Sequence, residues 1–296
     1  MGSVMLQIHR GIPFNAAKAD SAGQAFSGIS MLEVEFAELS DPGKVRERNE
    51  DYVGRAVPAK PEEARTHGWL FALADGVGGQ DRGEVASRTA VEMVVSSFRS
   101  ARADESPSGL LQRLVQASNL KVYETAAALR PGGSSMCTTL VACLLRYDRA
   151  TIAHVGDSRC YLIRRGHATI LTQDHTLVGE QVRMGLLSHE EASESERRHL
   201  LSRSLGAYMF VNAEINEHQV LPGDLLLLSS DGLHGSVTPK EIAAITSKSH
   251  DLAQAAHQLV SLAREKDGGD NISVQLLRIK NVERIGMYRG RPYKLR

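Results

Sequence analysis

The residues Trp69-Leu-Phe-Ala-Leu-Ala-Asp75-Gly-Val-Gly-Gly79 combine an almost continuously apolar run with a carboxylate and a glycine-rich turn. An unbroken apolar run of this length indicates a strand that is buried on both faces. A carboxylate at the tip of such a strand needs a cation or several hydrogen-bond donors, and glycines after it let the backbone approach a ligand closely. Taken alone, however, the segment is explained more simply as a strand that ends in an ordinary Asp-Gly turn.

The same pattern recurs at three other places in the chain. Leu225-Leu-Leu-Leu-Ser-Ser-Asp231-Gly232 and Thr151-Ile-Ala-His-Val-Gly-Asp157-Ser158 also end in carboxylates, and Asp270 stands just before the apolar residues 272–277. If that last strand runs antiparallel to the others, all four carboxylates meet at one end of the sheets. Two bare carboxylates about 4 Å apart repel by roughly 4 kcal/mol at an effective dielectric near 20. The sequence therefore predicts a divalent-cation site, and oxygen-only ligands favour Mg2+ or Mn2+ over zinc.

Length and composition are those of an ordinary globular protein. The chain has 296 residues, of which 42% are hydrophobic and 24% charged, and can form one large domain or two small ones. Its formal net charge is zero and it has no run of like charges, which argues against nucleic acid as a partner. No apolar stretch approaches the ~20 residues of a membrane span, and the N-terminus lacks the apolar core of a signal peptide. We interpret the three cysteines as buried free thiols and expect a cytoplasmic monomer.

The apolar pattern predicts strands, two helices, further strands, two helices and a final strand. Helices are expected at 83–98, 110–129, 239–246 and 252–266, and strands at 32–36, 52–57, 69–74, 138–146, 151–155, 160–164, 213–220, 224–230 and 271–279. Short hairpin connections exclude a doubly wound parallel sheet. We therefore predict an α+β fold in which two packed antiparallel sheets are flanked by pairs of helices, an α-β-β-α sandwich.

Four segments stand outside this pattern. Residues 1–30 are interpreted as a partly disordered extension whose residues 4–8 could add an edge strand, and residues 58–68 as a polar hairpin loop. Residues 281–296 are expected to be a basic, solvated C-terminal tail. The polar segment 174–210 has only short helical patterns, at 177–187 and 199–205. A segment of this length without strong periodicity is usually functional or mobile.

Six short motifs follow one another along the chain. They are Val45-Arg46-(x2)-Asn49-Glu50-Asp51, Ala74-Asp75-Gly76-Val77-Gly78-Gly79, Thr138-Thr139-Leu140, His154-Val155-Gly156-Asp157-Ser158-Arg159, Ser230-Asp231-Gly232-Leu233 and Asp270-Asn271. In this order they resemble the motifs of the metal-dependent type 2C Ser/Thr protein phosphatases in their compact bacterial form. Each motif alone is weak, but six in order over about residues 32–280 are specific. The resemblance implies a catalytic domain at 31–280, with a mobile flap at about 174–204 beside the site.

The resemblance also implies a centre of two Mn2+ or Mg2+ ions. Asp75 would bridge both ions, with the Gly76 carbonyl on one ion and Asp231 and Asp270 on the other. Asp157 matches the position that holds a third ion in bacterial relatives, with help from Asp231.

The remaining implied roles support this centre. Glu50 and Asp51 would hold metal-bound waters from behind the ligands, and Asn271 would support Asp270. Arg46 matches the arginine that binds the substrate phosphate, for which the paired donors of a guanidinium are well shaped.

The implied activity is hydrolysis of phosphoserine and phosphothreonine in proteins, opposing a bacterial Ser/Thr kinase. A water that bridges two divalent ions becomes hydroxide near neutral pH and attacks phosphorus in line. Animal relatives carry His at the position of Val77, so the general acid is unassigned. There are two candidates for the general acid. One is a metal-bound water near Asp157, and the other is the side chain of His154, although His154 is more simply a structural histidine in a strand. His199, in the flap, is a candidate ligand of the third ion.

Two other functions and one other role stay open. A pseudo-enzyme would use the same fold only to bind partners, and the intact set of Asp75, Asp231, Asp270 and Arg46 argues against it. A two-metal phosphodiesterase or nuclease would have similar ligands, and the neutral net charge argues against that. Asp157 is also compatible with a buried turn in which its carboxylate pairs with Arg159.

Overall fold

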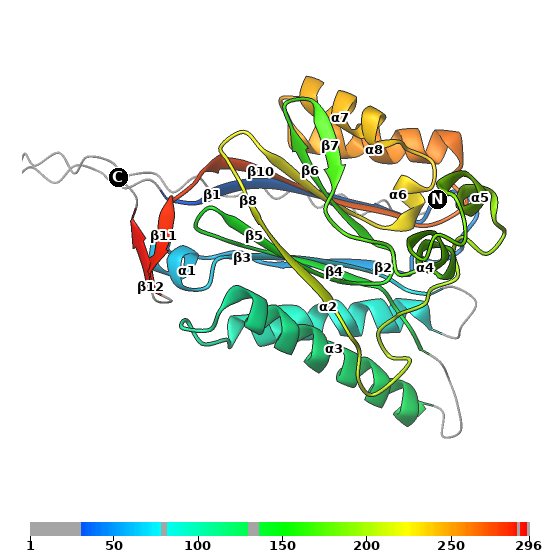
Figure 1. Ribbon diagram of the computed structural model, residues 1–296, viewed down its shortest axis with the longest axis horizontal. Coiled ribbons are helices and arrows are strands. Elements are labelled where there is room, and N and C mark those ends of the chain that lie inside the picture. The colour runs from blue at the N-terminus through cyan, green and yellow to red at the C-terminus, as the bar shows by residue number, and fades with distance from the viewer. Residues whose placement is uncertain (1–30, 78–81, 130–135, 289–290, 295–296) are drawn as a thin grey trace, which may run out of the picture.

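Two antiparallel sheets pack face to face, and each carries a pair of helices on its outer face (Figure 1). This computed structural model describes residues 31–77, 82–129, 136–288 and 291–294. The predicted α-β-β-α sandwich is confirmed. The proposed extension 1–30 with its edge strand, together with Gly78 and Gly79, lies outside the described residues.

The two sheets each contain five strands in antiparallel register. Sheet I contains, in spatial order, β1 (Glu33–Asp41), β10 (Ile272–Asn281), β9 (Leu225–Ser229), β6 (Arg159–Arg164) and β7 (His167–Ile170). Sheet II contains β2 (Asp51–Ala56), β3 (Trp69–Asp75), β4 (Leu140–Arg146), β5 (Arg149–Val155) and β8 (Glu214–Gln219).

The apolar run of β3 is explained by its place between two layers. Alternate residues of a strand point to opposite faces of its sheet, and both faces of β3 are covered. Phe71 and Leu73 belong to the core between the sheets, where Phe71 meets Phe36 of sheet I with ring centroids 5.3 Å apart. Ala72 and Ala74 belong instead to the core beneath the helices. Burial on both sides is why this strand does not alternate between apolar and polar residues.

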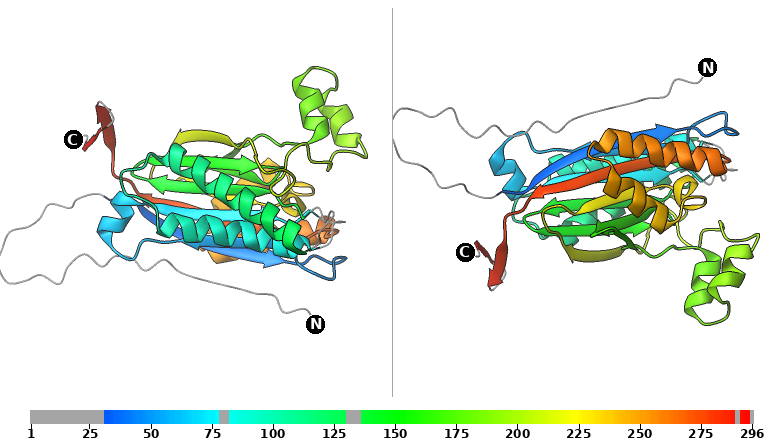
Figure 2. Two further views of the ribbon diagram at one scale, coloured as in Figure 1. Left: turned by 90° about the horizontal axis from the view of Figure 1, so that it is seen from below. Right: turned by 90° about the horizontal axis from the view of Figure 1, so that it is seen from above.

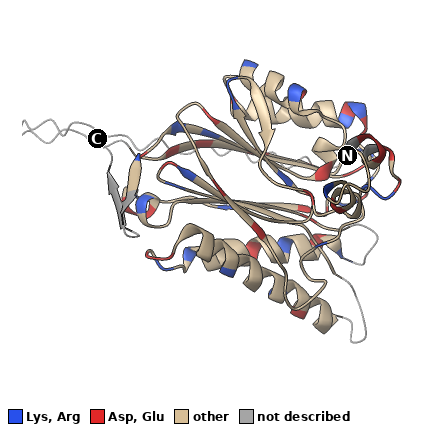
Figure 3. Ribbon diagram, in the orientation of Figure 1, with Lys and Arg blue, Asp and Glu red and all other residues tan. Residues whose placement is uncertain are grey.

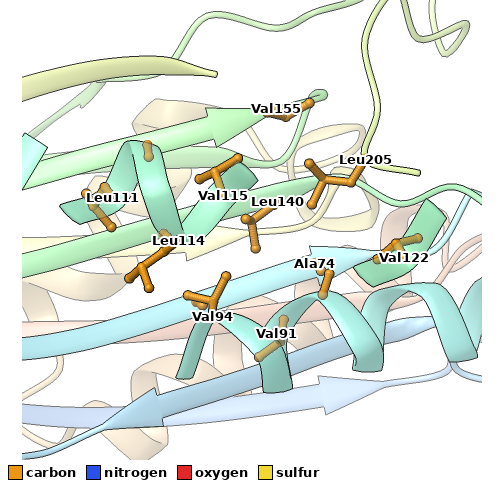
Figure 4. Packing of buried hydrophobic residues seen from close by; sticks show 14 of the residues in the cluster. Ala74, Val91, Val94, Leu111, Leu114, Val115, Val122, Leu140, Val155 and Leu205 are labelled. Atoms are coloured by element: carbon orange, nitrogen blue, oxygen red, sulfur yellow. The ribbon is translucent and has the colours of Figure 1, made fainter. Parts of the chain in front are cut away.

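The helices that flank the sheets have clear sequence causes. Sheet II is covered by α2 (Gly83–Arg99) and α3 (Pro107–Leu129), whose apolar faces meet β3 and β4 (Figure 4). Sheet I is covered by α7 (Pro239–Lys248) and α8 (Leu252–Lys266). A capping box between Thr238 and Glu241 begins α7. None of the described helices is long and apolar enough to cross a membrane.

Some local predictions are wrong. Residues Pro61–Thr66 of the expected hairpin loop form the helix α1, which has proline and two glutamates in its first turn. Residues 199–205 are not helical, because they pair through isolated bridges to Thr176 and Thr138 instead. The expected solvated tail contains a two-stranded sheet of β11 (Ile285–Tyr288) and β12 (Arg291–Lys294).

Residues 174–204 leave the sandwich at one end. They contain α4 (Leu177–Arg183) and α5 (His189–Glu194), which project from the body of the protein (Figure 2). The short helix α6 (Asp231–His234), which follows β9 directly, lies at the same end (Figure 1).

Candidate active site

All four strand-end carboxylates line a single cavity of about 430 Å3 at the end of the sandwich. Asp75 ends β3, Asp157 lies in the turn after β5, Asp231 begins α6 after β9, and Asp270 precedes β10. Acidic ribbon segments from both sheets lie at this end in Figure 3. Gly76 and Arg46 also line the cavity. The structure thus gathers side chains that are up to 224 positions apart in the sequence, from Arg46 to Asp270.

Glycines allow the surrounding turns to close on this cavity. A Cβ on Gly76 would lie 2.4 Å from the backbone carbonyl of Gly83 at the start of α2. A Cβ on Gly232 would lie 2.1 Å from the backbone oxygen of Asn271. No side chain fits at either distance, so glycine is required where β3 meets α2 and where β9 turns into α6.

The carboxylates in and behind this cavity perturb one another strongly. Burial raises the pKa of Asp75 well above its usual range, and repulsion from Asp51 and Asp231 adds to it. Burial likewise raises the pKa of Asp157 to about 8 and that of Asp51 to about 7. Burial is also the largest effect on Asp231, but the hydrogen bond from His199, the nearby His234 ring and a hydrogen bond with Asp75 together outweigh it and lower that pKa. Asp75, Asp157 and Asp51 therefore lack nearby positive charge to balance their own.

These residues fit a divalent cation. All the candidate ligand atoms are oxygens, which is the donor set that Mg2+ and Mn2+ prefer. Asp51 Oδ1 is buried and has no hydrogen-bond partner, although an unpaired buried carboxylate oxygen is costly. A nearby cation, or a water held by one, would satisfy it.

Arg46 reaches into the cavity from the loop between β1 and β2. Its Nη2 donates to Asp270 Oδ2 at 2.7 Å, and its side chain is 43% exposed. Arg46 is therefore placed to meet a ligand that enters from solvent while it contacts a candidate metal ligand.

Asn271 contacts both Asp270 and the loop that precedes β2. Its backbone N–H donates to Asp270 Oδ1 at 2.9 Å, but its side chain binds the loop that carries Arg46. Asn271 Oδ1 accepts from the Glu50 N–H at 2.7 Å, and its Nδ2 donates to the backbone oxygens of Pro42 and Arg48 at 3.0 and 2.9 Å. One amide thus ties the Asp270 turn to the arginine loop.

Glu50 and Asp51 lie behind the cavity and do not line it. Asp51 Oδ2 accepts from the Ser230 hydroxyl at 2.7 Å, and the Glu50 carboxylate packs against Gly83. Both carboxylates therefore lie one layer away from the candidate ligands.

Comparison with known proteins gives the family. The family model described as "Protein phosphatase 2C" matches residues 48–269, about three quarters of the chain. The chain belongs to this family. It is 33% identical over 255 residues to the "Serine/threonine phosphatase stp" of Listeria innocua. The aligned residues cover 85% of this chain and 96% of the relative.

Solved structures agree with this assignment. The S. agalactiae serine/threonine phosphatase is similar with a TM-score of 0.74 and 30% identity, covering 83% of this chain and all of that one. The catalytic domain of the serine/threonine phosphatase PstP in complex with two manganese ions has a TM-score of 0.69 and 32% identity, covering 84% of this chain and 99% of that one. The protein is accordingly a metal-dependent protein serine/threonine phosphatase, a hydrolase of the PPM type.

In this phosphatase Asp157 is not paired with Arg159. The Arg159 guanidinium instead donates to both carboxylate oxygens of Asp174, with Nε–Oδ1 and Nη2–Oδ2 distances of 2.9 and 2.6 Å. The salt-bridge alternative for Asp157 is therefore wrong, and its carboxylate faces the cavity.

Several residues around the cavity were not singled out from the sequence. The Thr139 hydroxyl accepts from the Asp75 N–H at 2.9 Å and lies 2.7 Å from the Ser158 hydroxyl. Thr139 stands in a quoted motif, but its contact with Asp75 joins residues 64 positions apart and has no local signal. Arg198 also lines the cavity from the flap side, and an arginine in a polar segment gives no indication of this. Val77, whose side chain is apolar, also lines the cavity.

A second group of potential metal ligands lies at the base of residues 174–204. Atoms of His154, His175 and Glu214 lie within 4.8 Å of one another, and the two rings stack with centroids 4.7 Å apart. The Gly156 N–H donates to His175 Nδ1 at 3.2 Å, and Nε2 lies 3.5 Å from Glu214 Oε2 and 3.4 Å from Arg203 Nη1. Both ring nitrogens of His175 therefore already face protein partners.

The His175 ring predicts an acid-sensitive contribution to stability. Burial, followed by His154, lowers its pKa from 6.5 to about 4. Between these values the unfolded chain binds a proton that the folded protein does not, so stability falls as the pH falls from 6.5 towards 4. The free energy lost at pH 5.5 is on the order of 1 kcal/mol.

Urea unfolding at pH 7.5 and 5.5 measures this contribution. We expect the loss of stability between the two pH values to shrink by on the order of 1 kcal/mol in His175→Gln. The exposed His257 provides the matched control, since His257→Gln should keep the wild-type difference. An unchanged pH difference in His175→Gln would show that this ring is not a buried neutral histidine.

Proposed function

We propose that this phosphatase holds two Mn2+ or Mg2+ ions in its cavity and uses them to hydrolyse phosphoserine and phosphothreonine. Asp75, the Gly76 carbonyl, Asp231 and Asp270 would hold these ions, with Asp75 shared by both. The observation that carries the proposal is the convergence of mutually repelling carboxylates, Asp157 buried and the others half-buried, in one cavity. The two manganese ions of the related PstP domain support the choice of metal.

The residues of the chain divide the work of the reaction. The bound cations supply an acidified water and the positive charge that phosphoryl transfer requires. Arg46 binds the phosphoryl oxygens with its guanidinium donors, which point into the cavity. Glu50 and Asp51 orient waters from behind the ligands. Val77 cannot donate a proton, so the leaving alkoxide takes its proton from another group.

The reaction class is tested with paired probes. We expect turnover of a phosphothreonine peptide and of p-nitrophenyl phosphate, and no turnover of bis(p-nitrophenyl) phosphate. Faster cleavage of the diester than of the peptide would support a phosphodiesterase and contradict the proposal.

Arg46→Ala is expected to raise KM for a phosphothreonine peptide by about 10- to 150-fold, with a smaller change in kcat. A lost charge-assisted contact corresponds to roughly 1.5–3 kcal/mol, and the metal ligands stay in place. Arg48 is the matched control, because its side chain is 76% exposed and it does not line the cavity. An unchanged KM together with an unchanged kcat in Arg46→Ala would remove Arg46 from the site.

We further propose that Asp157 holds a third, weakly bound ion with help from Asp231. Few protein ligands reach this position, and Mg2+ and Mn2+ then keep much of their hydration and bind loosely. Asp157→Ala should therefore keep two tightly bound ions and lower kcat about tenfold at saturating Mn2+, a loss of roughly 1.4 kcal/mol. Isothermal titration with Mn2+ and steady-state kinetics measure the two effects.

Asp174→Ala provides the contrast for this variant. It leaves the Arg159 guanidinium without its bidentate partner, so its melting temperature should fall. Asp157→Ala should melt no lower than the wild type, because it removes a buried carboxylate that is repelled by its neighbours. If Asp157→Ala instead melts several degrees lower and turns over normally, the third-ion role is wrong.

The organisation and setting of the chain are also proposals. We infer a catalytic domain at 31–280 with a flap at 174–204, preceded by an extension at 1–30 and followed by a tail at 281–296. All three cysteines are free and buried, as predicted, which supports a reducing compartment such as the cytoplasm. A kinase must supply the substrates, so we propose a cognate Ser/Thr kinase and a monomeric phosphatase that opposes it. Loss of the phosphatase should raise cellular phosphothreonine, and no change would contradict this.

A further inference from the structure

Three consecutive large apolar side chains lie exposed in the loop before β8. Tyr208, Met209 and Phe210 are 77%, 51% and 76% exposed, and we call these three residues the apolar loop. Single exposed apolar residues are ordinary on protein surfaces, but a run of three on one loop marks a surface that contacts another molecule.

The backbone of the apolar loop is held by buried side chains of α3. Asn119 is fully buried, and its Nδ2 donates to the backbone oxygens of Tyr208 and Met209 at 2.9 and 3.0 Å. Its Oδ1 accepts from the Gly206 N–H at 2.9 Å. One amide thus uses both of its donors and its acceptor on this loop. The exposed side chains are therefore presented on a fixed backbone, which lowers the entropy cost of binding.

The helix α3 also holds the chain directly after the apolar loop. The segment before β8 passes over α3 in Figure 1, and the Val211 N–H donates to Gln116 Oε1 at 3.3 Å. Contacts from α3 therefore fix the backbone within the loop and on its C-terminal side.

The apolar loop follows a segment that is bridged to the edge of the cavity. Gly76 bridges to Thr138, and Thr138 bridges to Leu205, so Leu205 lies about 10 Å from Gly76 at the usual spacing of neighbouring strands. Tyr208 is three residues further on, which adds at most about 10 Å. The loop therefore lies at most about 20 Å from Gly76, which an extended peptide of about six residues spans. A substrate bound at the cavity can therefore reach the loop.

The size of the surface indicates what covers it. The three side chains expose about 400 Å2 in total, since each large side chain offers roughly 200 Å2. A stable interface buries about 800 Å2 per partner. The surface is too small for a permanent dimer and suits a brief contact that adds to binding at the cavity.

We propose that the apolar loop docks an apolar segment of the phosphoprotein substrate, about six residues away from the phosphorylated side chain. The inference rests on the proposed function, because it assumes that a phosphorylated residue occupies the cavity. It makes the loop a determinant of substrate choice, with the chemistry at phosphorus unchanged.

Two matched phosphothreonine peptides test the proposal. One carries Leu-Phe-Leu six to eight residues from the phosphothreonine on both sides, and the other carries serines at these positions. We expect the wild type to prefer the apolar peptide at least about fivefold in kcat/KM, through KM. The variant Tyr208→Ser/Met209→Ser/Phe210→Ser should lose this preference and keep wild-type turnover of p-nitrophenyl phosphate. Val57→Ser, which changes an exposed apolar residue beyond the far end of β2, should keep both.

The outcomes distinguish a failure of the docking role from a failure of the proposed phosphatase function. Equal kcat/KM for the two peptides in the wild type, or a preference that survives in the triple variant, overturns the docking role. Failure of the wild type to hydrolyse p-nitrophenyl phosphate and both peptides overturns the proposed function itself. A wild-type dimer that becomes a monomer in the triple variant, measured by light scattering, would show that a second copy covers the loop and would also overturn the proposal.

Discussion

Asp75→Asn is expected to lower kcat at least about a thousandfold on both p-nitrophenyl phosphate and a phosphothreonine peptide, with the fold retained. Asp75 is half-buried, belongs to a cluster of repelling carboxylates that lines the cavity, and would hold both of the proposed cations. Asparagine keeps the shape of the side chain but loses the negative charge that would hold the cations. A thousandfold loss corresponds to about 4 kcal/mol of transition-state stabilisation, which is reasonable for losing a divalent Lewis acid.

Thermal melting distinguishes this loss from misfolding. In metal-free protein Asp75→Asn should melt no lower than the wild type, because burial and repulsion already raise the pKa of Asp75 and asparagine carries no charge. Added Mn2+ should stabilise the wild type and have a much smaller effect on the variant. The exposed Asp104 gives a matched control, since Asp104→Asn should keep activity and metal response. Wild-type turnover by Asp75→Asn would exclude its role between the ions.

The sandwich could be predicted because its central strands are buried on both faces. The apolar residues run unbroken from Trp69 to Ala74 in β3 and from Leu225 to Leu228 in β9, so both buried strands are evident in the sequence. The capped helix α7 has an equally local signal. The helix α1 was missed because its six residues bury only Ala64, which leaves no apolar period to detect. The strand β7 was missed because it is mostly exposed and shows no apolar pattern. The helix predicted at 199–205 was wrong because these residues form long-range bridges instead.

The acidic residues of the site could be predicted from the sequence, but most of the hydrogen bonds and ion pairs around them could not. Asp75, Asp157 and Asp231 follow apolar runs, and a carboxylate at the end of such a run can be recognised from the sequence alone. The contacts of Asn271 with the arginine loop span more than 220 positions, and the Arg159–Asp174 pair depends on how residues 174–204 return to the sandwich. Such contacts follow from the packed fold, so local sequence patterns could not assign them.

Removing the metal is expected to abolish the activity of the intact protein. Without cations the buried carboxylates repel one another, and nothing acidifies a water for attack on phosphorus. Turnover of p-nitrophenyl phosphate and of the phosphothreonine peptide should fall together, because both depend on the same cavity. The melting temperature should rise when Mn2+ is restored, since bound cations neutralise the repulsion.

The most direct measurement is therefore a Mn2+ titration of metal-stripped protein, in which turnover and melting temperature are followed in the same samples. The account predicts background turnover in excess EDTA and full recovery with Mn2+ after the chelator is removed. It also predicts that the melting temperature rises over the same range of Mn2+ concentration. Full turnover by metal-stripped protein in excess EDTA would contradict it.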